Sequence, residues 1–127
     1  MGKAVTVDGC ELEDTTGGGS VNVEGSPSTK DFADGKGIFF GAVALSVSGS
    51  DGGGLIGDGN GAGTGTITGT GSSICDGTGQ PALLEDDTAT INVTGTTTPP
   101  GGSPTPVGPV PVTVKVKKAG QDKVIAL

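Results

Sequence analysis

The chain has 127 residues, which is enough for one domain and too few for two. It contains 27 Gly, three Phe and neither Trp nor Tyr, so a monomer can bury only a thin apolar core. The formal net charge of −7 argues against a nucleic-acid-binding protein, and the absence of His excludes Ser-His and Cys-His catalytic pairs.

Segments with the alternating pattern of β-strands recur along the chain, and most of them stop at Gly, Asn or Asp. In chain order they are residues 3–9, 19–25, 37–49, 65–69, 88–95, 110–120 and 122–127. Only residues 81–87, PALLEDD, have a helical composition, and this stretch is too short to be stable as an isolated helix. The sequence therefore predicts one all-β domain over residues 1–127, with few or no helices.

Two long stretches have the composition of loops. Residues 48–65 are Gly-rich and predict a turn region, while residues 96–111 hold most of the prolines. Because proline has no backbone N–H, we expect residues 96–111 to form an extended surface loop rather than a strand in a ladder. The basic residues 115–118, KVKK, are expected on the solvated face of an edge strand.

The N-terminal sequence MGKAVTVDGC has no apolar h-region, and no apolar stretch reaches transmembrane length. We therefore expect no signal peptide and synthesis in a cytosol. Two cysteines are too few for a disulfide scaffold.

Three segments share one order of features: residues 11–27, 66–87 and 112–127. Each has a β stretch, a tight turn with Gly and a small or polar residue, and a second short β stretch. The turns are Gly19-Ser20, Gly71-Ser72 and Gly120-Gln121. In the first two copies a Gly is followed two residues later by Pro, at Gly25 and Pro27 and at Gly79 and Pro81.

These residues resemble the PAAR-repeat family, the small β cones that tip the spikes of phage tails and contractile injection systems. The family pattern is matched by Ile67, Gly71-Ser72, Ile74, Gly79, Pro81-Ala82 and Asp86. Residues 21–27 give a weaker copy, with Ser28 in place of the alanine. The third copy ends before any Pro-Ala pair, so the resemblance covers about half of the chain.

The resemblance implies a small conical β domain with pseudo-threefold repeats and Gly/Pro-rich loops. It would cap a trimeric membrane-piercing spike or hub as a structural tip, one copy per trimer, and would contact the target cell envelope transiently. The site of action would be a virion tail baseplate or an injection-system spike assembled in the bacterial cytoplasm, with no nucleic acid, small-molecule substrate or cofactor. The turn residues would carry this role: Gly19, Ser20, Gly25, Pro27, Gly71, Ser72, Gly79, Pro81 and Gly120.

Many PAAR proteins bind zinc near the apex through three His and a Cys, and this sequence has no His. Cys10 and Cys75 could pair with each other, or they could share a metal with Asp76. Structural zinc prefers four nitrogen or sulfur ligands, so two thiolates and a carboxylate make a poor site. We expect no metal, and two isolated thiols packed as small apolar groups.

Other motifs point to chemistry only superficially. Residues 11–14 and 85–87 hold the paired carboxylates used in glycoside hydrolysis, but the chain lacks the aromatics of such clefts, and solvated turn acids are expected. Residues 52–57 match G-x-G-x-x-G, yet no helix follows to bind a phosphate. Residues 58–69 begin like a calcium loop but end in Gly69 where a Glu is required. We expect no enzymatic activity.

Two alternatives fit the same composition. One is a decoration or adhesin-like virion protein that binds a capsid or surface glycans as a symmetric β homotrimer. The other is a calcium-dependent Gly-rich β-solenoid, although the nonapeptide repeat of that class is absent.

Overall fold

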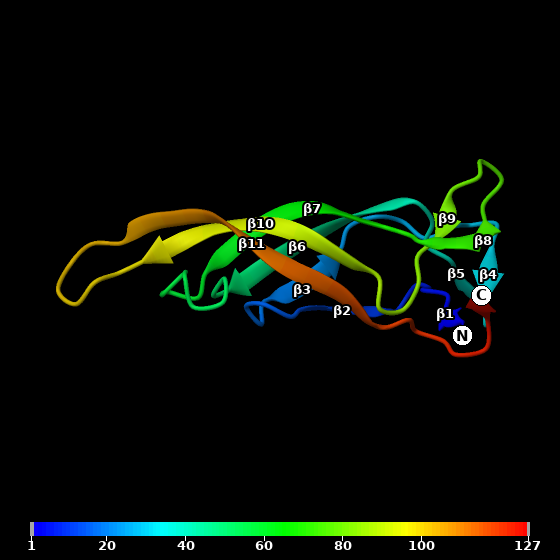
Figure 1. Ribbon diagram of the computed structural model, residues 1–127, viewed down its shortest axis with the longest axis horizontal. Helices are drawn as coiled ribbons and strands as arrows, with labels where there is room; N and C mark the ends of the chain where they lie inside the picture. The colour runs from blue at the N-terminus through cyan, green and yellow to red at the C-terminus, as the bar shows by residue number, and fades with distance from the viewer. Residues whose placement is uncertain (1, 127) are drawn as a thin grey trace.

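The computed structural model describes residues 2–126, and these residues form strands and turns without a helix (Figure 1). The all-β class predicted from the sequence is therefore confirmed. Met1 and Leu127, which end the predicted domain and the third predicted repeat, lie outside the described residues. No segment within residues 2–126 is a helix long and apolar enough to cross a membrane.

Six strands form one sheet that curls into a nearly closed barrel. Neighbouring strands are antiparallel, and their order is β2 (Glu11–Asp14), β11 (Thr105–Lys118), β10 (Thr88–Thr97), β7 (Gly61–Thr68), β6 (Ala42–Ser50) and β3 (Ser20–Val23). Side chains alternate across the sheet, so that Val43, Leu45 and Val47 of β6 are buried while Ala42 and Ala44 are exposed. The strand edges that face each other across the opening are those of β2 and β3.

The barrel core consists of aliphatic side chains and one aromatic ring. Its buried members come from β6, β7, β10 and β11, from the loop after β6, and from the short segments that follow β5 and β9: Phe39, Val43, Leu45, Val47, Ile56, Ile67, Leu83, Ile91, Val93, Val110, Val112, Val114 and Val116. Burying a side chain of this size stabilises the fold by about 1.5–3 kcal/mol. A thin core of β-branched residues thus replaces the aromatic residues that the sequence lacks.

Glycines allow β7 to lie close to β10. A Cβ atom on Gly63 would overlap the carbonyl oxygen of Asn92, and a Cβ atom on Gly65 would lie 2.6 Å from Cδ1 of Ile91. A larger residue at position 63 would push the two strands apart, and one at position 65 would require the Ile91 side chain to move. The Gly-rich composition of β7 is therefore a packing requirement.

The prediction of a loop over residues 96–111 is wrong for its second half, where residues 105–111 form the first half of β11. Pro106 and Pro111 pair with Thr96 and Asn92 of β10, and a register shift lies between these pairs. The described partners of β2 on β11 begin at Val114, so residues 105–111 have only one strand neighbour. Proline is tolerated there because its missing N–H faces away from the ladder.

The Gly-rich loop predicted over residues 48–65 is also shorter than expected. Strand β6 continues to Ser50 and β7 begins at Gly61, which leaves residues 51–60 as the connection. Asp51 folds this loop back, because its Oδ1 accepts a 2.8 Å hydrogen bond from the backbone N–H of Gly53. Ile56 within the loop is fully buried and packs in the barrel core.

Three two-stranded sheets gather at one end of the elongated molecule, where the chain ends also lie, and the β10–β11 connection forms the opposite end (Figure 1). They pair β1 (Lys3–Ala4) with β12 (Ile125–Ala126), β4 (Phe32–Ala33) with β5 (Lys36–Gly37), and β8 (Gly71–Cys75) with β9 (Pro81–Ala82). A second core lies among them, made of Val5, Val7, Ala33, Ile38, Ala82, Leu84 and Ala126.

Candidate functional site

Three short backbone segments meet in a closed ring at the end of the barrel. The N–H of Thr6 donates to the carbonyl of Leu83 at 2.8 Å, and the N–H of Leu83 donates to the carbonyl of Phe39 at 2.9 Å. The N–H of Phe39 then donates to the carbonyl of Thr6 at 3.1 Å and closes the circuit. Each of the three central residues therefore donates to one neighbour and accepts from the other.

The same relationship is repeated further out on each side of the ring. We call Thr6, Phe39 and Leu83 the ring centres. Three more hydrogen bonds flank them, and each joins the N–H of the residue two places after one ring centre to the carbonyl of the residue two places before another. They are Asp8 N to Gly37 O at 2.9 Å, Gly41 N to Pro81 O at 2.8 Å, and Glu85 N to Ala4 O at 2.9 Å. The ring of segments 4–8, 37–41 and 81–85 thus has a pseudo-threefold axis.

Residues next to the ring centres form three isolated bridges: Val5 with Leu84, Val7 with Ile38, and Phe40 with Ala82. Side chains alternate across the ring, as in a strand. Phe39 and Leu83 at ring centres pack in the barrel core, whereas the residues on either side belong to or pack against the second core. The ring is therefore a layer between two apolar cores.

Thr6 is the polar member of the three ring centres. Its side chain is fully buried, and its Oγ1 has no hydrogen-bond partner, the single such buried side-chain atom recorded within residues 2–126. A buried hydroxyl without a partner costs about 1–3 kcal/mol of stability. The axis of the ring is therefore closed to solvent and carries one hydroxyl group that lowers stability.

The three two-stranded sheets lie at the three corners of the ring. In each sheet one outer-strand residue pairs with the residue two places before a ring centre: Phe32 with Gly37, Ile125 with Ala4, and Cys75 with Pro81. Phe32 and Ile125 are 57% and 45% exposed, and Cys75 is also exposed. The corners therefore present three exposed side chains of low polarity at equivalent positions.

The turns at two corners are set by aspartates. Asp34 and Gly35 both have positive φ, 52° and 75°, as a tight turn between β4 and β5 requires. Between β8 and β9, Oδ1 of Asp76 accepts hydrogen bonds from the hydroxyl and the N–H of Thr78 at 2.7 and 2.8 Å. The Thr78 hydroxyl and the N–H of Gln80 hold the pKa of Asp76 below its usual value. In the third corner, β1 and β12 come from the two ends of the described chain.

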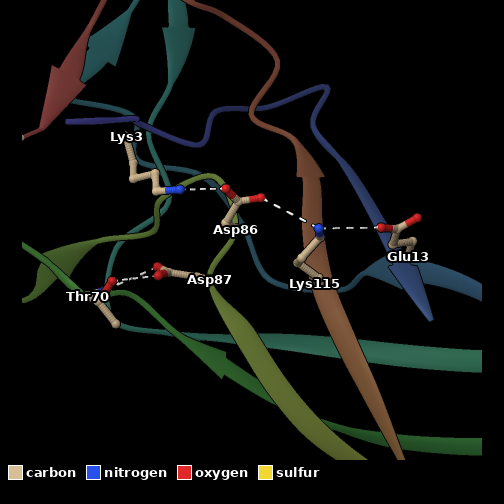
Figure 2. A network of polar contacts seen from close by, with 6 residues as sticks. All are labelled: Lys3, Glu13, Thr70, Asp86, Asp87 and Lys115. Carbon is tan, nitrogen blue, oxygen red and sulfur yellow. Dashed lines mark hydrogen bonds and ion pairs between the residues drawn. The ribbon is translucent and has the colours of Figure 1, made fainter. Parts of the chain in front are cut away.

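A polar network connects the ring end to the barrel (Figure 2). Lys3 Nζ lies 2.6 Å from Asp86 Oδ2, and Lys115 Nζ on β11 lies 3.7 Å from Asp86 Oδ1 and 4.0 Å from Glu13 on β2. The hydrogen bond from Lys3 and its charge lower the pKa of Asp86. All four side chains are solvent-accessible, so water and salt screen each ion pair and it contributes little to stability. The network therefore serves to orient the ring end relative to the barrel more than to stabilise the fold.

Asp87 adds a second connection next to this network (Figure 2). Its Oδ2 accepts the N–H of Leu84 at 2.8 Å and the N–H of Thr70 at 3.2 Å, and its Oδ1 accepts the hydroxyl of Thr70. Residues 85–87, expected as solvated turn acids, thus have two members with defined partners.

Most of the predicted turn residues lie outside the ring. Gly19, Ser20, Gly25 and Pro27 lie in or beside β3, Gly71 and Ser72 belong to β8, Gly79 lies in the β8–β9 connection, and Gly120 follows β11 with a φ of 91°. Only Pro81 is a ring residue, because the ring uses segments 4–8, 37–41 and 81–85, and of these only 81–85 lies within a predicted copy. The missed signal is a shared pattern, AVTVD, GIFFG and PALLE, with an Asp-Gly-x-Gly that overlaps the start of the second segment at residues 34–37 and another that precedes the third at residues 76–79.

The two cysteines are free and have different surroundings. Cys10 is half-buried against the barrel core, and burial raises its pKa to about 11. Cys75 is exposed at a ring corner. No group of three or more His, Cys, Asp and Glu within residues 2–126 could hold a metal ion, so Cys10, Cys75 and Asp76 do not form one.

No family model matches the chain, and neither a curated protein nor a solved structure matches it. The ring and its three corners are therefore the features from which a function can be inferred.

Proposed function

We propose that the chain is the structural tip of a trimeric membrane-piercing spike, in a phage tail or a contractile injection system. The ring end would bind the blunt end of the spike trimer. The barrel would then point away from the spike, and the β10–β11 connection would be the first part to meet the target envelope.

The observation that carries this proposal is the closed ring through Thr6, Phe39 and Leu83. A single chain usually offers no matching surface to three identical subunits. Here three sides of one chain repeat the same backbone hydrogen bonds, and each ends in a two-stranded sheet whose outer strand has no second strand neighbour within residues 2–126. Each corner can pair with one subunit, because a free strand edge is a template for another strand.

The positions of the exposed apolar side chains also support the choice of the ring end as the docking surface. Among residues 2–126 three large hydrophobic residues are exposed: Phe32 and Ile125 lie at ring corners, and Leu55 lies in the loop between β6 and β7. Exposed apolar residues grouped around one end are typical of an interaction site. Docking would also bury apolar area that the small chain cannot bury alone.

The test is a stoichiometry measurement. The purified chain is mixed with the C-terminal fragment of the spike protein encoded beside it, and the complex is weighed by native mass spectrometry. One chain per spike trimer is the expected result. Self-trimerisation without the spike fragment would contradict the proposal and favour the decoration or adhesin-like protein.

Corner variants test whether the ring end makes the contact. Phe32→Asp together with Ile125→Asp is expected to abolish the 1:3 complex, because both changes place a charge on the docking surface. Leu55→Asp is the control, since it makes one such substitution at an exposed apolar position that lies away from the ring, and each single corner variant is compared with it. Equal loss of binding in both variants would rule out the ring end as the docking surface.

A further inference from the structure

The first half of β11 is an uncovered strand edge. Residues 105–111 pair with β10 on one side, whereas β2 begins to pair with β11 only at Val114. Thr113 is already satisfied at this edge, because its carbonyl accepts the N–H of Thr15 at 2.8 Å and its N–H donates to Thr16 Oγ1 at 2.9 Å. Residues 105–111 are therefore the part of β11 that a further strand could reach.

The directions of the peptide groups near Thr113 follow from its hydrogen bonds. Thr113 directs its N–H and C=O away from β10, toward the turn after β2. Every second residue of a strand directs these groups to the same side, so positions 111 and 109 also face outward. Val110 and Val112 lie between them and face their partners Val93 and Ile91 on β10.

The other end of the edge is fixed by the hydrogen bonds of Thr96. Its N–H donates to Asn60 Oδ1 at 2.9 Å, and its carbonyl accepts the N–H of Asp58 at 3.1 Å. Thr96 therefore directs both groups away from Pro106, its partner on β11. The two residues of a non-hydrogen-bonded pair point to opposite outer sides, so position 106 faces outward as well.

All three of these outward positions are proline, at 106, 109 and 111. Proline has no N–H, so the edge offers carbonyl acceptors at these positions and no donors. An antiparallel neighbour needs both groups, because hydrogen-bonded residues exchange two bonds per pair. Gly108, with a φ of 122°, lies within the register shift between Val107 and Val110 and interrupts the ladder further.

Charged side chains do not protect this edge. Exposed edges are commonly protected by Lys, but residues 88–114 contain no charged residue. The basic residues 115–118, expected on an edge strand, lie instead in the half of β11 that β2 covers. The outer strands of the ring corners, β4, β8 and β12, contain no proline. Proline therefore distinguishes the uncovered edge of β11 from the edges at the ring corners.

We propose that Pro106, Pro109 and Pro111 close this edge to strand addition and prevent two copies of the chain from pairing through β11. Without them the edge would be extended and uncharged, which is the kind of edge that pairs with an identical one. Two copies would pair antiparallel about a twofold axis, with position 106 of each near position 111 of the other. This role does not depend on the proposed spike-tip function, because it concerns the opposite end of the molecule.

The test restores two of the missing N–H groups. Pro106→Thr with Pro111→Thr leaves the register shift unchanged and introduces residues that favour strands. Sedimentation velocity should show a monomer for the unchanged chain and a concentration-dependent dimer for the variant, with an association constant at least about tenfold higher. Pro99→Thr with Pro104→Thr is the matched control. It removes two exposed prolines from the β10–β11 connection, outside the strands, and should leave the chain monomeric.

Hydrogen exchange separates edge pairing from misfolding. In the variant, the backbone amides at positions 106 and 111 should exchange quickly in the monomer and slowly once the dimer forms, while the amides of β6 and β7 stay protected throughout. A variant that remains monomeric would overturn the proposal, and so would association accompanied by lost protection in β6 and β7. Dimerisation of the unchanged chain through residues 105–111 would also overturn it.

Discussion

Ser50 and Asp14 lie 36 residues apart in sequence, and the Ser50 hydroxyl donates a 2.6 Å hydrogen bond to Oδ2 of Asp14. The same carboxylate accepts backbone N–H groups from Thr16, Gly17 and Gly19 at 3.0, 2.8 and 3.2 Å. Only 5% of Asp14 is exposed. One buried carboxylate thus closes the turn between the two barrel edges and attaches it to the end of β6.

This cluster predicts an acid-sensitive contribution to stability. Burial opposes ionisation of Asp14, but the hydrogen bonds from Ser50 and the three N–H groups outweigh it, so the pKa is lowered. A carboxylate with a lowered folded-state pKa stabilises the fold above its unfolded pKa of about 3.9, and this contribution is lost as pH falls through the folded value. We expect Asp14→Asn to cost about 2 kcal/mol at pH 7.

The measurement is guanidinium unfolding followed by far-UV circular dichroism at pH 7 and at pH 3. The difference in the free energy of unfolding between Asp14→Asn and the unchanged chain should be smaller at pH 3 than at pH 7. Asp122→Asn, an exposed aspartate, is the control and should change stability little at either pH. A difference that stays constant with pH would contradict the assigned ionised state.

Removing the unpartnered hydroxyl at the ring axis should stabilise the protein. Thr6→Val keeps the shape of the side chain and removes a buried polar atom, so we expect a gain of about 1 kcal/mol in the free energy of unfolding. Thr66→Val on β7 makes the same change at an exposed position and reports strand propensity alone. A loss of stability specific to Thr6→Val would indicate that the hydroxyl has a partner.

The close approach of β7 and β10 predicts a strong position effect for glycine. Gly63→Ala places a methyl group on the carbonyl of Asn92 and should destabilise the fold by about 2–3 kcal/mol. Gly77→Ala lies in open space within the β8–β9 connection and should change stability by less than about 0.5 kcal/mol. Thermal unfolding of both variants checks this, and similar melting temperatures would argue against the close strand contact.

The two thiols should react at very different rates. Cys10 is half-buried, and burial raises its pKa to about 11, so its thiol is protonated at pH 8. Cys75 is exposed to solvent. Iodoacetamide should therefore modify Cys75 first, and Cys75→Ser should leave a chain that reacts quickly only in denaturant. Mass spectrometry of the time course gives the answer, and rapid labelling of Cys10 in the folded chain would exclude its assigned surroundings.

Alternation along single strands made the all-β class predictable. Val43, Leu45 and Val47 are buried at every second position, and this pattern is local. The ring could not be predicted in the same way, because Thr6, Phe39 and Leu83 belong to segments that are far apart in sequence and only about five residues long. Their pattern becomes meaningful only when the three segments are compared with one another.

Two further features depend on tertiary context. Asp14 looked like a solvated acid because carboxylates are seldom buried, and only Ser50 and the turn N–H groups make its burial possible. Residues 105–111 looked like a loop because of their prolines, and only the one-sided pairing of that part of β11 makes a strand possible.

The pairing of Lys3 and Ala4 with Ala126 and Ile125 has a topological consequence. The third corner is equivalent to the β4–β5 and β8–β9 hairpins, but the chain ends stand where the other two have a turn. A short linker between the ends would convert the chain into a closed circle. Cutting such a circle at Asp34-Gly35 would give a circular permutant. The hydrogen bonds of the ring would then be formed by a chain that begins and ends at the β4–β5 corner.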